Sequence, residues 1–195
     1  MFNGIIFNTC RIKSIKKNKK SILIEMQNKL KIKKKDLGSS IACNGVCLTV
    51  FKIKNNSIFF YISNETLKKT NFRFLKKNQI INLEPSIVYG QKISGHFIQG
   101  HVDTTAKVLK IDLIDKTWMV KFYISNISYK KFLIEKGSIA INGVSLTISK
   151  VTNRFFEVNI IPHSLELTNF SKLKVNDIVN VELDIFGKYI YKYSN

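Results

Sequence analysis

The sequence contains few of the residues that mark disulfide-rich, membrane-spanning or secreted proteins. Its 195 residues include three cysteines, Cys10, Cys43 and Cys47, an odd number without a CxxC spacing. This pattern gives no support for a disulfide framework or a zinc site, and we expect reduced thiols in a cytoplasmic protein. No apolar run approaches the roughly 20 residues of a membrane helix. Residues 1–15 lack a basic segment followed by an apolar core, so no signal peptide and no membrane partner are predicted.

Arginine is scarce as well, although the chain is strongly basic. The formal net charge is +19, and only 3 of the 32 basic residues are arginine. A charge of this size is typical of proteins that bind nucleic acid or an anionic surface. Asparagine and isoleucine are also abundant, however, and a mutational bias toward A- and T-rich codons produces the same mixture without any binding partner. We therefore expect no nucleic-acid partner.

The hydrophobic content of 45% predicts a globular protein, and an internal repeat shows how it is organised. Residues 39–50 recur as residues 137–148, and eight of the ten residues from Ser40 to Thr49 are identical to their counterparts from Ser138 to Thr147. The same offset of 98 relates residues 66–72 to residues 164–170. The period is far longer than the roughly 20–50 residues of a solenoid unit. The chain is therefore a duplication of one domain.

Short strands dominate both copies. Asn44-Gly45 and Asn142-Gly143 each lie between two β-rich arms, and Asn-Gly tolerates positive φ at both central positions of a hairpin turn. About six short strands in each copy predict a small closed barrel. Residues 90–95 are expected to form the linker, and short helices are expected at 65–69 and 129–135. The other strands are expected at 2–15, 21–26, 57–62, 79–83, 102–111, 118–125, 155–161 and 177–183.

The copies differ at positions where the second has gained polar groups. Ile5 corresponds to His101, Cys47 to Ser145, Glu65 to His163 and Ser86 to Asp184. A serine and an aspartate brought together, with a histidine nearby, can move protons. Each residue also has a structural interpretation: the serine can bond a neighbouring strand, and Asp184 can cap a helix in the C-terminal tail. Spacing alone demonstrates no Ser/His/Asp triad.

The order and spacing of these motifs resemble riboflavin synthases over essentially the whole chain. The resemblance is carried by Met1–Ile6, Gly95–Asp103, both Asn-Gly hairpins and Ile161–Leu165. It implies an all-β fold of two tandem six-stranded Greek-key barrels, residues 1–93 and 94–184, followed by a short C-terminal helix at 185–195. It also implies a homotrimer that needs no metal or other cofactor.

The reaction implied by the resemblance is the dismutation of two 6,7-dimethyl-8-ribityllumazine molecules. A four-carbon unit passes between them, which gives riboflavin and 5-amino-6-(ribitylamino)uracil. Facing pockets turn an encounter of two substrates into a positioned reaction, which is worth roughly 7–11 kcal/mol of the barrier. In the family each substrate pair lies between the first barrel of one subunit and the second barrel of its neighbour.

Motif by motif, the resemblance also implies the pocket residues. The first pocket is expected to comprise Gly4, Ile5, Ile6, Cys47, Leu48, Thr49, Tyr61, Ile62, Ser63, Asn64, Glu65 and Thr66. The second is expected to comprise Gly100, His101, Val102, Lys136, Ser145, Leu146, Thr147, Val158, Asn159, Ile160, Ile161, Pro162 and His163.

The predicted catalytic residues are His101, Ser145, Asp184 and Cys47. Ser145 with Asp184 is expected to assist addition of a nucleophile, and His101 is expected to assist proton movement. A lone serine hydroxyl is a weak nucleophile, so water or a substrate hydroxyl activated at that position is an equal alternative.

A rival interpretation is a non-catalytic lumazine- or flavin-binding protein of the same fold, which needs only one competent pocket. Both copies keep their hairpin and loop motifs, which favours the enzyme. A nucleic-acid-binding barrel is a more distant alternative, because it requires aromatic and basic side chains together on one barrel face.

Overall fold

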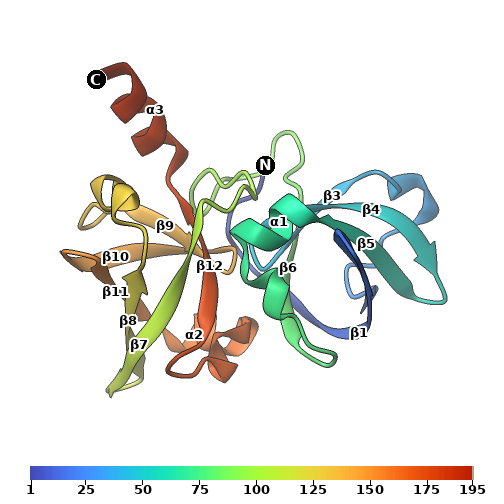
Figure 1. The fold of residues 1–195 in the computed structure, drawn as a ribbon, viewed down its shortest axis with the longest axis horizontal. Helices are drawn as coiled ribbons and strands as arrows, with labels where there is room; N and C mark the ends of the chain where they lie inside the picture. The colour runs from blue at the N-terminus through green and yellow to red at the C-terminus, as the bar shows by residue number, and fades with distance from the viewer. Residues whose placement is uncertain (195) are drawn as a thin grey trace.

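The computed structural model describes residues 1–194, and Figure 1 shows two barrels side by side with the N-terminus between them. Each barrel is closed, with neighbouring strands in the order β1-β2-β5-β4-β3-β6 and β10-β11-β8-β7-β12-β9. These orders are equivalent when β7 to β12 are matched with β1 to β6. The predicted fold class, a tandem pair of six-stranded all-β barrels, is confirmed.

The elements of the two barrels correspond one to one, apart from the placement of one 3-10 turn before the third strand of each. The first barrel comprises β1 (Asn8–Asn18), β2 (Ser21–Gln27), β3 (Ser40–Cys43), β4 (Val46–Lys54), β5 (Ser57–Ser63) and β6 (Ile80–Pro85), with helix α1 (Asn64–Lys69) and 3-10 turns η1 (Lys34–Asp36) and η2 (Asn71–Phe74). The second comprises β7 (Thr104–Ile114), β8 (Thr117–Ile124), β9 (Ser138–Ile141), β10 (Val144–Thr152), β11 (Phe155–Ile160) and β12 (Ile178–Leu183), with helix α2 (Pro162–Leu167) and 3-10 turns η3 (Ile127–Phe132) and η4 (Asn169–Lys172).

Both Asn-Gly hairpins form as predicted. Asn44 and Gly45 have φ of 45° and 76°, and Asn142 and Gly143 have φ of 46° and 79°. Positive φ at both central residues is the turn geometry whose twist matches the flanking strands. The turns join β3 to β4 and β9 to β10, and the first residues of β4 and β10 bear the candidate site.

The two hairpin turns meet at the junction of the barrels. A Cβ atom placed on Gly45 would lie 2.7 Å from the backbone nitrogen of Gly143, and one on Gly143 would lie 2.7 Å from that of Gly45. Glycine is therefore required at both positions, because a side chain on either would force the backbones apart.

A ring of asparagines fixes this junction with matched hydrogen bonds. The Nδ2 atom of Asn82 donates to the Asn142 carbonyl at 3.0 Å, and that of Asn180 donates to the Asn44 carbonyl at 2.9 Å. The backbone N–H groups of Asn82 and Asn180 donate to the Oδ1 atoms of Asn44 and Asn142 at 2.8 and 2.9 Å. The four side chains are buried, and buried amides stabilise a unique arrangement only when their polar atoms are paired in this way.

Two short segments, residues 2–6 and 98–102, each precede the first strand of one barrel and pack against the other barrel; we call them the exchanged segments. Phe2 and Ile98 pair as an antiparallel bridge. Ile6 precedes β1 of the first barrel but is buried in the core of the second, whereas Val102 precedes β7 of the second barrel but packs against the core of the first. The expected continuous strand at 2–15 is thus wrong at its start, because residues 2–6 leave for the other barrel and β1 begins at Asn8.

Helix α3 (Ile185–Ser194) follows β12 directly and extends away from the second barrel (Figure 1). The predicted C-terminal helix is present as far as Ser194, and Asn195 lies outside the described residues. An ion pair from Lys188 to Asp103, at 2.9 Å, ties α3 to the segment that leads into β7.

Candidate functional site

The exchanged segments decide which predicted site residues come together. The Ser145 N–H donates to the Gly4 carbonyl at 2.9 Å, and the Cys47 N–H donates to the Gly100 carbonyl at 2.8 Å. The expected grouping of Gly4 to Ile6 with Cys47, and of Gly100 to Val102 with Ser145, is therefore wrong. Sequence correspondence cannot reveal the exchange, because each segment is covalently joined to one barrel and packs on the other.

Glycine is necessary where each segment passes its site strand. Gly4 and Gly100 have φ of +76° and +79°, the left-handed region. A Cβ atom on Gly4 would lie 2.7 Å from both the Cβ and the backbone nitrogen of Ser145, and one on Gly100 would lie 2.6 Å from the Cβ of Cys47. Each segment thus lies directly against the residue at which the two copies differ in chemistry.

Ser145 has a histidine partner that is not among the residues predicted from the sequence. The Oγ atom of Ser145 lies 2.7 Å from Nδ1 of His96. Burial lowers the pKa of His96, and the negative charge of Asp184 opposes that shift by raising it. A neutral imidazole is favoured in this setting, and neutral imidazole accepts a proton from a hydroxyl group as a general base.

Asp184 therefore influences the Ser145–His96 pair electrostatically, because its negative charge favours the protonated form of His96. Its Oδ1 atom accepts a hydrogen bond from the Phe186 N–H at 2.9 Å, at the start of α3. The structure brings Ser145, His96 and Asp184 into one region, whereas the predicted His101 is exposed on the segment that lies against Cys47 of the first barrel.

The repeat explains why a comparison of the two copies misses His96. Near the start of each copy the offset is 96, so that Gly4 corresponds to Gly100, and His96 lies before the segments that the comparison matches. Such a comparison can find only residues that both copies contain. The one available signal is the Gly95–Asp103 segment, which contains two histidines, of which the prediction includes only the second.

The remaining predicted residues lie at the matching ends of strands and helices. Residues 61–66 span the end of β5 and the start of α1, and residues 158–163 span the end of β11 and the start of α2. Thr49 and Thr147 are exposed at equivalent places on β4 and β10. Ser63 caps α1, because its Oγ accepts from the Thr66 N–H at 3.2 Å. Lys136 is exposed in the turn before β9 with φ of 65°, and its N–H donates to the Ile148 carbonyl at 2.8 Å.

Cys47 differs from the other cysteines in accessibility. Cys10 and Cys43 are buried, and burial raises the pKa of Cys10 to about 12, so these thiols are inert at neutral pH. Cys47 is half-buried at the start of β4. Cys47 is therefore the most accessible of the three thiols.

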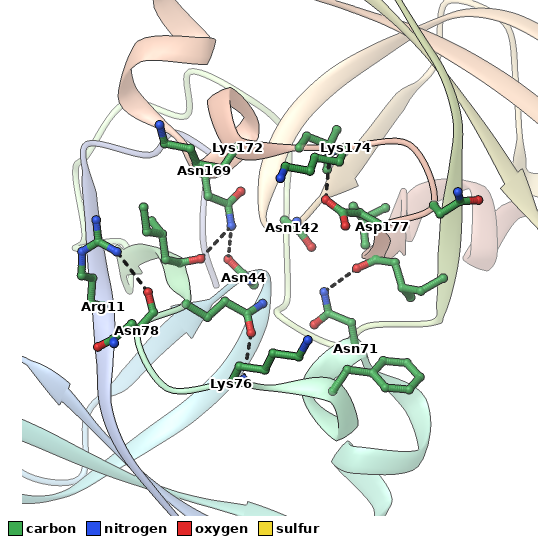
Figure 2. A pocket seen from close by; sticks show the side chains of 17 residues that line it. Arg11, Asn44, Asn71, Lys76, Asn78, Asn142, Asn169, Lys172, Lys174 and Asp177 are labelled. Atoms are coloured by element: carbon green, nitrogen blue, oxygen red, sulfur yellow. Dashed lines mark hydrogen bonds between the residues drawn. The ribbon is translucent and has the colours of Figure 1, made fainter.

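A separate cavity of about 650 Å³ lies at the junction of the barrels, on the side of the asparagine ring (Figure 2). Arg11, Lys76, Lys172 and Lys174 line it together with Asp177, and none of the predicted site residues is part of its lining. The cavity is thus distinct from the Ser145 and Cys47 surfaces.

Other kinds of site receive no support from the described part of the chain. Within residues 1–194, no group of three or more His, Cys, Asp and Glu side chains is arranged to hold a metal ion. None of the helices in that range is both long enough and apolar enough to cross a membrane.

Comparison with known proteins agrees with this architecture. The lumazine binding domain family matches the chain twice, at residues 3–86 and 99–184. The riboflavin synthase of Actinobacillus pleuropneumoniae is 37% identical over 99% of this chain and 89% of its own length. Those of Bacillus subtilis and Escherichia coli are 37% and 36% identical over 99% and 94% of this chain, and 89% and 87% of their own lengths.

Solved structures show the same fold with ligands bound. LumP complexed with 6,7-dimethyl-8-(1'-D-ribityl) lumazine superimposes with a TM-score of 0.80 at 27% identity, covering 93% of this chain and 98% of that one. LumP complexed with riboflavin superimposes with a TM-score of 0.82, also at 27% identity, covering 94% and 99%. With two lumazine-binding domains and full-length similarity to these enzymes, the chain belongs to the riboflavin synthase family.

Proposed function

We propose that this protein is a riboflavin synthase that converts two molecules of 6,7-dimethyl-8-ribityllumazine into riboflavin and 5-amino-6-(ribitylamino)uracil. The atoms of the two substrates account for both products, so the reaction consumes no external oxidant or reductant. The observation that carries the proposal is the pair of equivalent barrels with unlike polar groups at the same position, Ser145 beside His96 in one and Cys47 in the other.

Identical substrates need unlike surroundings, because one molecule gives up the four-carbon unit and the other accepts it. In our proposal Gly4, Ile5 and Ile6 form one edge of the Ser145 pocket, and Gly100, His101 and Val102 form one edge of the Cys47 pocket. Backbone N–H and C=O groups of these segments form hydrogen bonds with the lumazine ring system, and the hydroxyl groups of Thr49 and Thr147 bind the ribityl chains.

The Ser145–His96 pair supplies the acid–base chemistry in this scheme. The reaction needs a proton removed from the acidic C7 methyl group of one lumazine and a nucleophile added to the other. Neutral His96 accepts the proton of the Ser145 hydroxyl, or of a water held there, as that oxygen adds to the substrate. Asp184 stabilises the imidazolium that forms, because its charge favours the protonated ring.

A homotrimer is also part of the proposal. Exposed apolar and aromatic side chains gather on α3, where Phe186, Tyr189, Ile190 and Tyr193 are between 53% and 77% exposed. A surface of this kind on an extended helix is typical of one that contacts other protein copies. We place the enzyme in the cytoplasm, because its three cysteines are unpaired.

The competing function is non-catalytic binding of a lumazine or flavin, and similarity to LumP complexed with such ligands favours it. Incubation of the purified protein with the lumazine separates the two functions. A riboflavin synthase produces flavin fluorescence and one pyrimidine for each riboflavin. A protein that binds the lumazine with no release of either product contradicts the enzymatic proposal.

A further inference from the structure

Two buried carboxylates occupy equivalent positions near the ends of β6 and β12. Glu84 is 5% exposed and Glu182 is 3% exposed. Within residues 1–194 neither of them forms an ion pair. A buried carboxylate is expensive to desolvate, so its remaining partners must compensate for the lost water.

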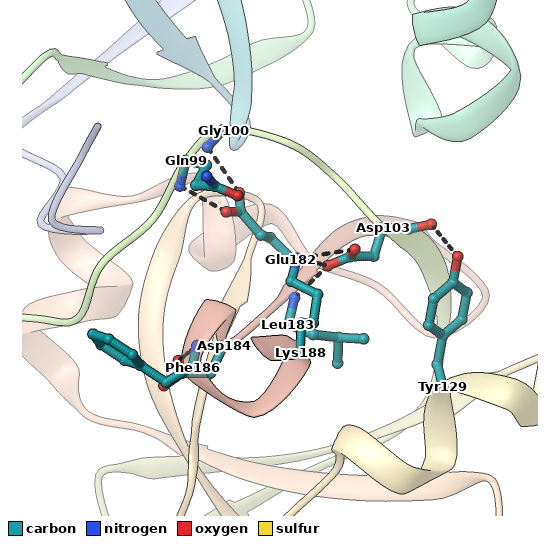
Figure 3. Close-up of polar contacts among 9 residues, drawn as sticks. All are labelled: Gln99, Gly100, Asp103, Tyr129, Glu182, Leu183, Asp184, Phe186 and Lys188. Carbon is teal, nitrogen blue, oxygen red and sulfur yellow. Dashed lines mark hydrogen bonds and ion pairs between the residues drawn. The ribbon is translucent and has the colours of Figure 1, made fainter. Parts of the chain in front are cut away.

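The partners are backbone N–H groups of the exchanged segments. One oxygen of Glu84 accepts from the Asn3 N–H at 2.7 Å, and the other accepts from the Gly4 N–H at 3.0 Å. Glu182 accepts from the Gln99 N–H at 2.7 Å and from the Gly100 N–H at 2.9 Å (Figure 3). Hydrogen bonds to a charged acceptor are about twice as strong as neutral ones.

Each glycine then connects its carboxylate to a site residue. The Gly4 residue lies between Glu84 and Ser145, because its N–H donates to the carboxylate and its carbonyl accepts from the Ser145 N–H. Gly100 lies in the same way between Glu182 and Cys47. Glu84 belongs to the first barrel and Ser145 to the second, whereas Glu182 belongs to the second barrel and Cys47 to the first.

We propose that Glu84 and Glu182 are positioning residues that act across the junction, Glu84 on the Ser145 pocket and Glu182 on the Cys47 pocket. The inference rests on the proposed function, because it takes these two surfaces as ligand pockets. Each carboxylate holds its glycine in the left-handed conformation that turns residues 5 and 6, or 101 and 102, along the edge of the pocket.

The charge state of these groups is part of the arrangement. Burial raises the pKa of Glu84 to about 7, and the N–H groups of residues 3–5 and the N-terminal ammonium group of Met1 lower it. Burial also raises the pKa of Glu182, with Asp103 raising it further and Lys188 and the N–H groups of Gln99 and Gly100 lowering it. Replacement by glutamine removes the charged form of either group. Each oxygen of Glu182 accepts one N–H, so an NH₂ group in place of either oxygen loses a hydrogen bond. In Glu84 the Gly4 N–H is shared between both oxygens, at 3.1 and 3.0 Å, so the NH₂ group faces the Gly4 N–H and removes one of its two acceptors.

Alkylation of cysteine provides a separate readout for each pocket. Riboflavin is the probe, because it occupies a pocket without turning over, and the rate of iodoacetamide labelling at Cys47 reports occupancy of the first-barrel pocket by peptide mass spectrometry. A Cys47→Ser, Ser145→Cys double variant moves the label to the second-barrel pocket, where only binding is measured. The carboxylates are changed by Glu84→Gln and Glu182→Gln in both backgrounds, with Glu25→Gln on β2 as a control that removes a charge elsewhere.

The expected result is crossed. Glu182→Gln raises the riboflavin concentration that half-protects Cys47 about tenfold and leaves protection of the cysteine at position 145 within about twofold, and Glu84→Gln does the reverse. Glu25→Gln changes neither. The inference is overturned if either variant weakens riboflavin binding equally in both pockets, or if neither variant weakens it in any pocket.

Two further arms keep the test decisive. If riboflavin fails to protect Cys47 in the unchanged protein, the proposed pocket is wrong and the inference falls with it; protection there with no effect of the variants overturns the inference alone. If a glutamine variant does not fold, as judged by circular dichroism, Glu84→Asp and Glu182→Asp replace it. Each keeps the charge with a shorter side chain, and the same crossed pattern is expected.

Discussion

The two barrels share a strand order, a hairpin turn and a buried carboxylate, yet they differ at the second residue after each turn. In the second barrel Ser145 contacts His96, which follows the linker. In the first barrel Cys47 occupies that position, and exposed His101 lies on the segment beside it. The two copies thus present equivalent positions, and in the proposed mechanism His96, from the segment after the linker, makes the Ser145 position an acid–base site.

The largest effect is expected at Gly4 and Gly100, the equivalent glycines at which each exchanged segment passes a strand of the other barrel. Gly4→Ala and Gly100→Ala should each lower turnover more than about 100-fold, because a misplaced edge disturbs substrate position. Gly90→Ala is the matched control, because Gly90 also has positive φ, +82°, but a Cβ atom there would meet nothing within 4 Å. It should cost roughly 1–2 kcal/mol of folding stability and leave turnover unchanged. Unchanged turnover in Gly4→Ala, as expected for Gly90→Ala, would contradict the proposed importance of the close approach between Gly4 and Ser145.

The histidines provide the sharpest test of the difference between the barrels. His96→Gln should lower kcat about 100-fold or more, which is the usual contribution of general acid–base catalysis. His101→Gln should have a smaller effect on kcat and a larger one on KM, because His101 lies on the edge of a binding pocket. Steady-state kinetics of both variants decide the matter, and a larger kcat loss for His101→Gln would reverse the proposed roles.

A third test concerns the carboxylate of the first barrel and the stability of the fold. A pKa of about 7 for Glu84 in the folded protein, against an ordinary 4.5, means that the folded state holds a proton that the unfolded state releases. The resulting stabilisation is complete below pH 4.5 and is lost as the pH rises through 7, to a total of at most about 3 kcal/mol. Denaturant unfolding at pH 5 and pH 8 measures it. Glu84→Gln should remove this part of the pH dependence, and an unchanged difference between the two pH values would contradict the assignment.

The smallest expected effect belongs to a contact that only the second barrel has among the described residues. Lys188 pairs with Asp103 at 2.9 Å, with side chains 23% and 16% exposed. Lys188→Ala should cost about 1 kcal/mol or less in thermal or denaturant unfolding. A loss of several kcal/mol in the free energy of unfolding would indicate that this ion pair, and not the pairing of β7 with β12, holds α3 against the segment before β7.

Much of the fold can be predicted from local signals. Asn44-Gly45 and Asn142-Gly143 specify hairpins because the turn needs two residues that tolerate positive φ, and the repeat shows that one barrel solution serves twice. The exchange of residues 2–6 and 98–102 cannot be predicted in this way. Each segment packs one apolar residue, Ile6 or Val102, against the core of the other barrel. The contacts that accompany this exchange, such as those of Glu84 and Glu182, join residues about 80 positions apart and leave no local pattern in the sequence.

The candidate site can likewise be predicted from the sequence only where it does not depend on tertiary contacts. Ser145, Asp184 and Cys47 emerge from divergence between copies, because that comparison isolates positions where chemistry changed while the turn did not. His96 lies outside the matched segments, and its contact with Ser145 depends on how the chain passes the second barrel after the linker. A pattern restricted to matched positions has no information about that path.

The most direct test of the central claim is a count of riboflavin sites by equilibrium titration of the unchanged protein. Two cradles with unlike polar groups predict two molecules bound per chain with distinguishable affinities, and Gly4→Ala should weaken one class of site while Cys47 remains protected from alkylation. A single site per chain, or two sites that Gly4→Ala weakens equally, would contradict an account in which each barrel receives its pocket edge from the segment of the other.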